Sequence, residues 1–308
     1  MVTEPEQPTR RDFLLRAAAL TATLSRPFSV SAQETLPTRT IPVSGEALPV
    51  VGFGSTQSVL ESPTEGTDPI ASVIRTLKRY GGRVVDTSPR TQTIDREFGQ
   101  VLQDPELKDR LFLATKINTI GDLSGVGQMR HTQRLFGRRA LDLVQVESLR
   151  DLNVHWPNLR SWKDSGEARY IGATVSDDAH HDALESFMRR ESPDFVHLNY
   201  SVMETRAEER LLPLAQDRGM AVLTNRPFMN GAYFGRVASR NLPDWVKEFD
   251  CESWAQFSLK YVLANPAVTC ALTETTNPDH MDENIHAAFG RLPNEFLKRR
   301  MRELVREF

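Results

Sequence analysis

The feature of this sequence that most constrains its fold is an alternation of short apolar runs with amphipathic stretches, repeated from residue 50 to residue 289. The apolar runs suit strands of a parallel sheet that is buried on both faces. They cover residues 50–54, 83–86, 111–117, 141–147, 170–175, 195–200, 221–225 and 268–273. The stretches between them place apolar residues three and four positions apart, which predicts helices. They cover residues 69–80, 94–103, 123–136, 158–165, 179–190, 207–218, 253–264 and 279–289.

Eight strands and eight helices in strict alternation predict an α/β fold, the closed (β/α)8 or TIM barrel. The alternative is an open doubly wound sheet, which usually has fewer repeats and a glycine-rich phosphate turn after its first strand. The first strand here ends in Gly52-Phe53-Gly54-Ser55-Thr56, which lacks the third glycine of that turn. The barrel is therefore the favoured interpretation.

Two additions to the barrel are expected. Residues 40–43 and 47–51, joined by a turn at Ser44 and Gly45, predict a β-hairpin ahead of the first strand. Residues 293–308 are heavily charged and predict an extra C-terminal helix that packs on the outside.

Composition and charge exclude several classes of protein. The chain has 38 Lys and Arg residues against 41 Asp and Glu, a formal net charge of −3. No nucleic-acid partner is expected, because nucleic-acid-binding domains are strongly basic. With 39% hydrophobic and 26% charged residues, the chain has the composition of a soluble domain with a sizeable core. Wholesale disorder and a multi-span membrane protein are excluded, and nothing in the sequence sets an oligomeric state.

The first 32 residues read as an export signal. Arg10 and Arg11 precede a short apolar run over residues 17–24, and small residues around Ala32 suit a cleavage site. The run is shorter than the roughly 20 apolar residues that a membrane span needs. We therefore expect a twin-arginine signal at 1–32, recognised by the twin-arginine export machinery, and a barrel at 33–308 in the periplasm or outside the cell. The alternative is an amphipathic first helix with a chance arginine pair.

The two cysteines are expected to be core residues. The helix between Cys251 and Cys270 would hold them roughly 20 Å apart at 1.5 Å per residue, which is too far for a disulfide. Neither has metal-ligand spacing with the seven histidines, so no metal site is expected.

Three charged residues mark the candidate site. Asp86, Lys116 and Glu147 each end, or nearly end, an otherwise apolar run. In a barrel the carboxyl ends of the strands meet at one mouth, where the chemistry of this fold takes place. An acid, an amine and a second acid around one pocket suit general acid–base work, and they equally suit a structural ion-pair cluster.

At these residues the sequence resembles the aldo-keto reductases over residues 39–293. The resemblance rests on seven motifs in the same order, at residues 50–54, 85–89, 114–116, 142–146, 169–174, 225–228 and 277–284. It implies a barrel with a leading hairpin. It also implies hydride transfer from NADPH to a carbonyl, with NAD as a second cofactor to consider.

The family's catalytic tetrad of Asp, Tyr, Lys and His is only half present. Asp86 and Lys116 match its aspartate and lysine, whereas Thr91 stands where the resemblance places the tyrosine and Glu147 where it places the histidine. The family tyrosine donates a proton to the carbonyl oxygen. A threonine hydroxyl is far too weak an acid to replace a phenol with a pKa of about 10.

Three explanations of the altered tetrad stay open. Another donor serves, such as a protonated Glu147, Tyr233 or an ordered water. The barrel is a catalytically silent protein that binds a nicotinamide cofactor or another ligand without turnover. Or the reaction needs no strong donor. Glu147 itself has a precedent in relatives that reduce a conjugated C=C bond and carry Glu at the histidine position, but those relatives keep the tyrosine. A sugar-active barrel using Asp86 and Glu147 is disfavoured, because Lys116 would lie between the two carboxylates.

The resemblance also implies cofactor contacts. Gly54 and Ser55 would border the nicotinamide, Thr174 its carboxamide, and Tyr200 the face of its ring. The pyrophosphate arm would follow Asn225, Arg226 and Phe228. The adenosine end would lie against Thr275, Thr276, Glu283 and Asn284.

One glutamate near the expected adenosine end and four aromatic residues elsewhere are also assigned roles. Glu274 would repel a 2′-phosphate, which weakens the case for NADP over NAD without removing it. His155 and Trp156 are expected to wall the pocket for a small-molecule substrate, and His180 and His181 to be solvated helix caps.

Overall fold

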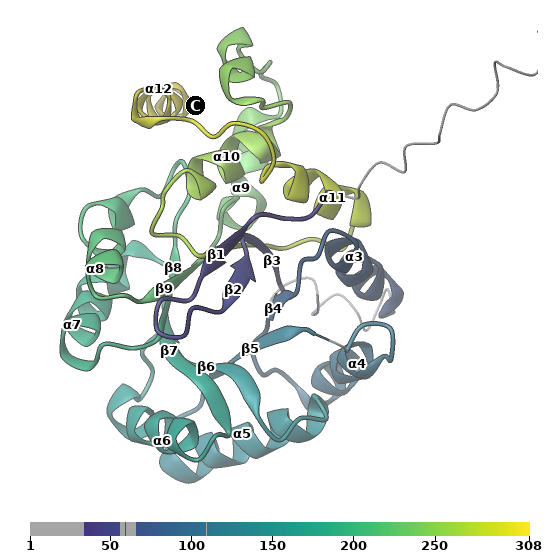
Figure 1. Cartoon of the computed structure of the whole chain (residues 1–308), viewed down its shortest axis with the longest axis vertical. Coiled ribbons are helices and arrows are strands. Elements are labelled where there is room, and N and C mark those ends of the chain that lie inside the picture. The colour runs from purple at the N-terminus through teal and green to yellow at the C-terminus, as the bar shows by residue number, and fades with distance from the viewer. Residues whose placement is uncertain (1–33, 56–58, 60–65, 109) are drawn as a thin grey trace, which may run out of the picture. The chain divides into compact units, whose positions relative to one another are not determined.

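Eight parallel strands close into a barrel in the computed structural model, which describes residues 34–55, 59, 66–108 and 110–308. The strand order is β10-β3-β4-β5-β6-β7-β8-β9, so neighbours in sequence are neighbours in space until β10 closes on β3 (Figure 1). The strands are β3 Val51–Gly54, β4 Val84–Asp86, β5 Phe112–Ile117, β6 Leu141–Glu147, β7 Ala168–Thr174, β8 Phe195–Asn199, β9 Ala221–Asn225 and β10 Cys270–Thr273. The predicted TIM barrel is confirmed.

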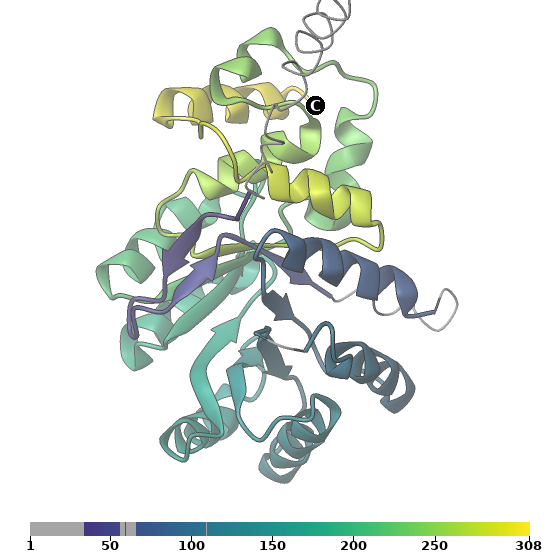
Figure 2. The same ribbon diagram turned by 45° about the vertical axis from the view of Figure 1, so that its right-hand side comes forward.

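Helices surround the barrel, because each strand is followed by an amphipathic segment whose apolar side packs back on it (Figures 1 and 2). They are α3 Asp68–Arg79, α4 Gln92–Gln103, α5 Asp122–Leu135, α6 Leu152–Asp164, α7 His181–Glu191, α8 Leu211–Asp217, α10 Trp254–Leu263 and α11 Pro278–His286. The extra C-terminal helix is α12, Glu295–Arg306. Among the described helices, none is both long and apolar enough to cross a membrane.

The barrel interior near the starts of the strands is filled by aromatic rings. Phe112, Tyr170 and Phe195 come from three different strands, and their ring centroids lie 5.5 to 6.0 Å apart. The larger apolar cluster lies outside the barrel wall, between strands and helices. Strands buried on both faces explain why the sequence shows continuous apolar runs.

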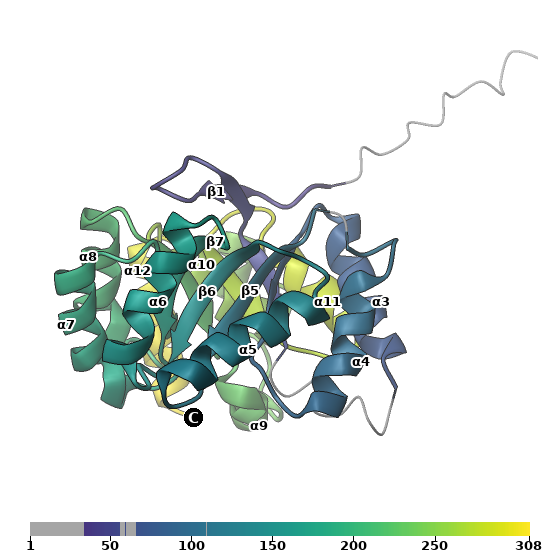
Figure 3. The ribbon, with the colours of Figure 1, turned by 90° about the horizontal axis from the view of Figure 1, so that it is seen from below.

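The hairpin closes the amino-terminal end of the barrel (Figure 3). It consists of β1, Thr38–Thr40, paired antiparallel with β2, Ala47–Pro49. Ile41 and Leu48 reach into the interior apolar cluster. The hairpin was predicted, but its first strand ends three residues earlier than expected, because Ile41 begins the connecting turn.

The helix after β6 also departs from the prediction. α6 begins at Leu152, six residues before the expected start, and Pro157 lies inside it. In the loop between β6 and α6, the residues Ser148, Leu149 and Asp151 have positive φ values. The chain thus makes its turn in the loop rather than at the proline.

The sequence predicted no helix between β9 and α10, and both cysteines were assigned to the core. α9, Ala232–Val237, and the 3-10 helix η4, Asp244–Phe249, lie between β9 and α10 where no helix was expected. Cys251 and Cys270 are both buried and carry free thiols, which confirms their assignment to the core. The predicted signal at 1–32 lies outside the described residues.

Candidate functional site

The carboxyl end of the barrel holds a layer of inward-facing polar residues. Side chains alternate between the two faces along each strand, and the inward apolar positions include Val84, Ala114, Leu143, Phe195 and Leu223. Two positions further along the same strands come Asp86, Lys116, Gln145, His197 and Asn225. An apolar plug is therefore followed by a polar layer at the end where the chemistry of this fold takes place.

A buried ion pair lies at the centre of this layer. Lys116 Nζ lies 2.5 Å from Asp86 Oδ2 and donates a second hydrogen bond of 3.0 Å to the carbonyl oxygen of Thr87. Asp86 is 3% exposed and Lys116 is 4% exposed. Gln145 donates from Nε2 to the other Asp86 oxygen over 3.2 Å. Buried charges need such partners, and both oxygens of this carboxylate have one.

Glu147 joins the same site through the loop after β4. The Oγ atom of Ser88 donates to Glu147 Oε1 over 3.2 Å, and the neighbouring Thr87 carbonyl accepts from Lys116. The three charged side chains predicted at successive strand ends are therefore brought to one loop. Sequence reasoning missed Ser88 and Gln145.

A second cation at this mouth, Arg90, was also missed. Its guanidinium donates to Thr87 Oγ1 at 2.9 Å, to the Ser88 carbonyl at 2.7 Å and to the Ser55 carbonyl. Arg90 thereby joins the loops that follow β3 and β4. Burial lowers the pKa of the guanidinium, and four surrounding carboxylates oppose this effect: Asp95, Glu274, Asp86 and Glu147.

His197 is a fourth residue of this site that the sequence did not indicate. The ring is 2% exposed and neither nitrogen has a hydrogen-bond partner. Burial lowers the pKa of His197 to about 4; the Asp86 carboxylate opposes this and the Lys116 ammonium adds to it. The ring is therefore neutral at pH 7. A polar residue two positions after Phe195 in an apolar run was the available signal.

Neither Thr91 nor Tyr233 is placed to donate a proton at the mouth. Thr91 is exposed, just ahead of α4. Tyr233 is 1% exposed and its hydroxyl donates to the carbonyl oxygen of Trp254 over 3.0 Å. Burial raises the pKa of the Tyr233 phenol. The suggestion that Tyr233 serves as the donor is therefore wrong.

The residues expected around a nicotinamide occupy neighbouring strand ends. Gly54 pairs with Asp86, and Thr174 pairs with both Glu147 and His197. The buried hydroxyl of Ser55 donates to the Asp86 carbonyl over 2.8 Å. Ser55 thus fixes the backbone beside the ion pair.

The residues expected along a pyrophosphate follow β9. Asn225 donates from Nδ2 to the Val175 carbonyl over 2.9 Å, and its buried Oδ1 has no partner. Arg226 pairs with Glu204 over 3.1 Å. Phe228 packs against Phe234, with ring centroids 4.9 Å apart. An incoming phosphate would therefore compete with Glu204 for Arg226.

The expected adenosine residues flank the start of α11. Asn277 caps this helix by accepting from the backbone N–H of Asp279 over 2.8 Å. Thr275 and Thr276 lie just before the cap and are partly buried. Glu283 and Asn284 lie on α11 itself. Together these residues form one edge beside β10.

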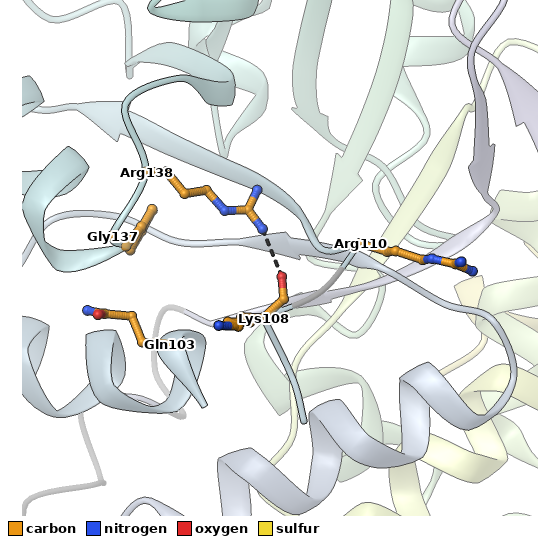
Figure 4. Close-up of a pocket in the computed structure, with 6 residues that line it drawn as sticks. Gln103, Lys108, Arg110, Gly137 and Arg138 are labelled. Carbon is orange, nitrogen blue, oxygen red and sulfur yellow. Dashed lines mark hydrogen bonds between the residues drawn. The ribbon is translucent and has the colours of Figure 1, made fainter. Parts of the chain in front are cut away.

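A hollow lies on another face of the barrel. It measures about 410 Å³ and is lined by Gln103, Lys108, Arg110, Phe136, Gly137 and Arg138. These residues precede β5 and β6, so the hollow lies at the amino-terminal ends of those strands (Figure 4). Arg138 is held there by the Lys108 carbonyl and by Asp142. None of the residues that line this hollow belongs to the polar layer.

A model of the aldo/keto reductase family matches residues 51–304. The chain belongs to this family. Members with known structures share its fold. An aldo-keto reductase from Bacillus halodurans in its holo form has a TM-score of 0.68 and 18% identity, over 88% of this chain and 96% of that one. An aldo-keto reductase from Klebsiella pneumoniae in complex with NADPH has a TM-score of 0.67 and 17% identity, over 89% and 95% of the two chains.

Two curated proteins are similar to this chain in sequence. The uncharacterized oxidoreductase YrpG of Bacillus subtilis is 23% identical over 64% of this chain and 72% of its own length. The NADH-specific methylglyoxal reductase of Escherichia coli is 24% identical over 42% of this chain. The match spans 46% of that reductase.

Tyr200 does not present its ring at the mouth, contrary to the expectation from the family resemblance. The side chain is fully buried, its ring lies 5.8 Å from that of Tyr261 on α10, and its hydroxyl donates to Glu208. Burial is the main reason that the pKa of this phenol is raised. Tyr200 therefore packs between the barrel and the outer helices.

Three other expectations for this family member are corrected. His155 is fully buried and bonds through Nε2 to the Thr119 carbonyl, and Trp156 packs edge-on against Phe187. Both belong to the helical layer and do not wall a substrate pocket. His181 is buried rather than solvated, because Nε2 meets Asn199 Oδ1 at 2.8 Å. Among the described residues, no group of His, Cys, Asp and Glu is arranged to hold a metal ion.

Proposed function

We propose that this chain is an oxidoreductase that uses a nicotinamide dinucleotide to reduce a carbonyl, or an activated C=C bond, of a small molecule. The observation that carries this proposal is the buried Lys116–Asp86 pair, which lies beside Glu147 at the carboxyl end of the barrel. A cation and a carboxylate in a low-dielectric mouth suit the stabilisation of charge that develops on a substrate oxygen.

The chain's own residues fit such a dinucleotide. The cofactor would supply the hydride. Asn225 has an unpartnered, buried Oδ1 that suits an amide N–H. Thr174 offers a hydroxyl at the neighbouring mouth position. The start of α11 suits a phosphate, because backbone N–H groups at a helix N-terminus are free to donate.

The charge of the adenosine edge favours NAD(H) over NADP(H). Residues 274–284 contain Glu274, Asp279, Asp282 and Glu283 but neither lysine nor arginine. A 2′-phosphate placed among these carboxylates would be repelled. The NADH-specific methylglyoxal reductase among the relatives is consistent with this preference.

A fluorescence titration with NADH and NADPH, followed by a spectrophotometric assay with aldehydes, ketones and enones, tests the proposal. We expect tighter binding of NADH and oxidation of the cofactor with at least one substrate class. A chain that binds neither dinucleotide would overturn the proposed function.

A silent barrel is the second candidate, favoured by the position of Thr91 where the family resemblance places the tyrosine. The double variant Thr91→Tyr, Glu147→His distinguishes the two. Carbonyl reduction that appears only in the double variant supports the silent protein. Turnover by the wild type that falls in Glu147→Gln supports the enzyme.

We also propose that residues 1–32 are a twin-arginine signal and that residues 33–308 are exported. The compact unit Thr35–Phe308 contains the whole barrel, so removal of the signal leaves it complete. Amino-terminal sequencing of the protein from the periplasmic fraction tests this, with Gln33 as the expected first residue. The Arg10→Lys, Arg11→Lys variant should stay in the cytoplasm. Equal export of that variant would refute the signal.

A further inference from the structure

None of the chain's phenols is positioned to donate a proton at the mouth. The sequence contains five tyrosines, and all lie within the described residues. Each hydroxyl is bonded elsewhere: Tyr80 to Asp282, Tyr170 to Glu46, Tyr200 to Glu208, Tyr233 to the Trp254 carbonyl and Tyr261 to Glu208. Carbonyl reduction at this mouth would need a different acid.

Most other protic groups near the ion pair are unsuitable acids. Alcohol hydroxyls such as that of Ser88 are too weak, and an arginine guanidinium does not release its proton in proteins. His197 is neutral because burial lowers its pKa to about 4. Glu147 Oε1 is already engaged as the acceptor of the hydrogen bond from Ser88.

Lys116 has the required chemistry. An ammonium carries three N–H donors; Asp86 Oδ2 takes one and the Thr87 carbonyl takes another. The third has no partner among the described residues. In model compounds an ammonium and a phenol are acids of similar strength, with pKa values of about 10.4 and about 10. An ammonium at this position is thus a chemical substitute for the phenol.

We propose that Lys116 itself donates the proton to the substrate oxygen, rather than acting through a tyrosine. This inference rests on the proposed function. A hydride from the reduced nicotinamide forms the new C–H bond, the C=O π pair moves to oxygen, and the Lys116 N–H bond breaks as the O–H bond forms. The nicotinamide is oxidised and the carbonyl is reduced to an alcohol. Lys116 becomes a neutral amine, still held by Asp86 and Thr87, and regains its proton from water.

The decisive variant is Lys116→Arg, which keeps the cation but removes the transferable proton. General acid catalysis is worth about 10²- to 10⁴-fold, so we expect turnover to fall at least 100-fold while NADH affinity changes less than threefold. The control is Lys163→Arg, because Lys163 forms a similar 2.6 Å pair with Asp194 away from the mouth. It should keep wild-type turnover.

A measurement other than activity tests the same contact. In protein labelled with 15N at lysine Nζ, the Lys116 signal is identified by its loss in Lys116→Arg. With NAD bound, that signal should shift when a non-reducible primary amide is added as a carbonyl mimic. The Lys163 signal should not move.

Chemical rescue of a second variant, Lys116→Ala, tests the inference even if the arginine of Lys116→Arg does not fit into the site. Turnover by Lys116→Ala should rise with methylammonium, which restores an N–H acid, and not with tetramethylammonium, which has the charge alone. Wild-type-like turnover in Lys116→Arg, an unmoved Lys116 signal, or equal rescue by both ions would overturn the inference while leaving the oxidoreductase intact. A wild type that binds no dinucleotide, or binds it without turnover, would refute both.

Discussion

Lys116 Nζ and Asp86 Oδ2 lie 2.5 Å apart at the ends of two neighbouring strands, with 5% and 4% of their side chains exposed. The register of β4 against β5 explains why these side chains are in contact. Asp86 pairs with Ala114, so the next inward-facing residue on β5 is Lys116. The carboxylate is held on its other side by Gln145. The pair is therefore a fixed part of the barrel wall and not a mobile surface contact.

Breaking this pair from one side is expected to destabilise the fold strongly. Lys116→Met leaves a buried, uncompensated carboxylate and should lower the free energy of unfolding by about 3–5 kcal/mol. The double variant Asp86→Leu, Lys116→Met should lose less than the sum of the two single variants. Urea unfolding of the four proteins measures this coupling. In contrast, Lys247→Met removes an exposed pair with Asp244 and should cost under about 1 kcal/mol.

His197 makes stability depend on pH. Burial lowers its pKa from 6.5 to about 4, so between these values the unfolded chain binds more protons than the folded one. Stability should therefore fall as pH drops from about 6.5 to about 4, by about 3 kcal/mol in total. Above pH 6.5 the ring is neutral in both the folded and the unfolded chain, so His197 no longer lowers stability. Measuring the free energy of unfolding of wild type and His197→Gln at several pH values isolates the effect of His197. The same pH dependence in both proteins would contradict the prediction.

Glu208 fastens the C-terminal helix to the barrel. It accepts from Tyr261 at 2.8 Å and lies 3.1 Å from Lys298 and 3.3 Å from Arg302, both on α12. Glu208→Gln removes the charge that these cations face and should lower the free energy of unfolding by about 3 kcal/mol. Amide hydrogen exchange should accelerate first in α12. The adjacent exposed Glu209→Gln is the matched control, and equal effects of the two would refute this role.

Glu274 is expected to discriminate against NADP(H). Replacing this exposed carboxylate with a cation in Glu274→Lys should tighten NADPH binding by about fivefold, in keeping with about 1 kcal/mol for a solvent-exposed ion pair. NADH binding should change far less. Glu303→Lys on α12 makes the same change in net charge and controls for it. Unchanged NADPH affinity in Glu274→Lys would place the 2′-phosphate elsewhere.

Much of the architecture was readable because it follows from local patterns. Apolar runs of strand length, each followed by helical spacing, predicted the barrel and placed the bounds of its strands to within two residues. The charges of Asp86, Lys116 and Glu147 stood out because a charge at the end of an apolar run is costly unless it is paired. Alternation along β8 also contained a signal that was missed. Phe195 and His197 face inward, so Tyr200, at odd spacing from them, faces the helices.

The order of elements and the strand ends that carry charge could be predicted without the structure, because both depend on residues near one another in the chain. Only the tertiary structure decided which of those groups are partnered. The contacts of Arg90 with Ser55, of Gln145 with Asp86 and of Tyr200 with Glu208 depend on barrel closure and on helix packing. Closure also leaves His197 buried without a partner and every phenol bonded elsewhere, because hydrogen bonding depends on positions in space that local sequence patterns do not specify.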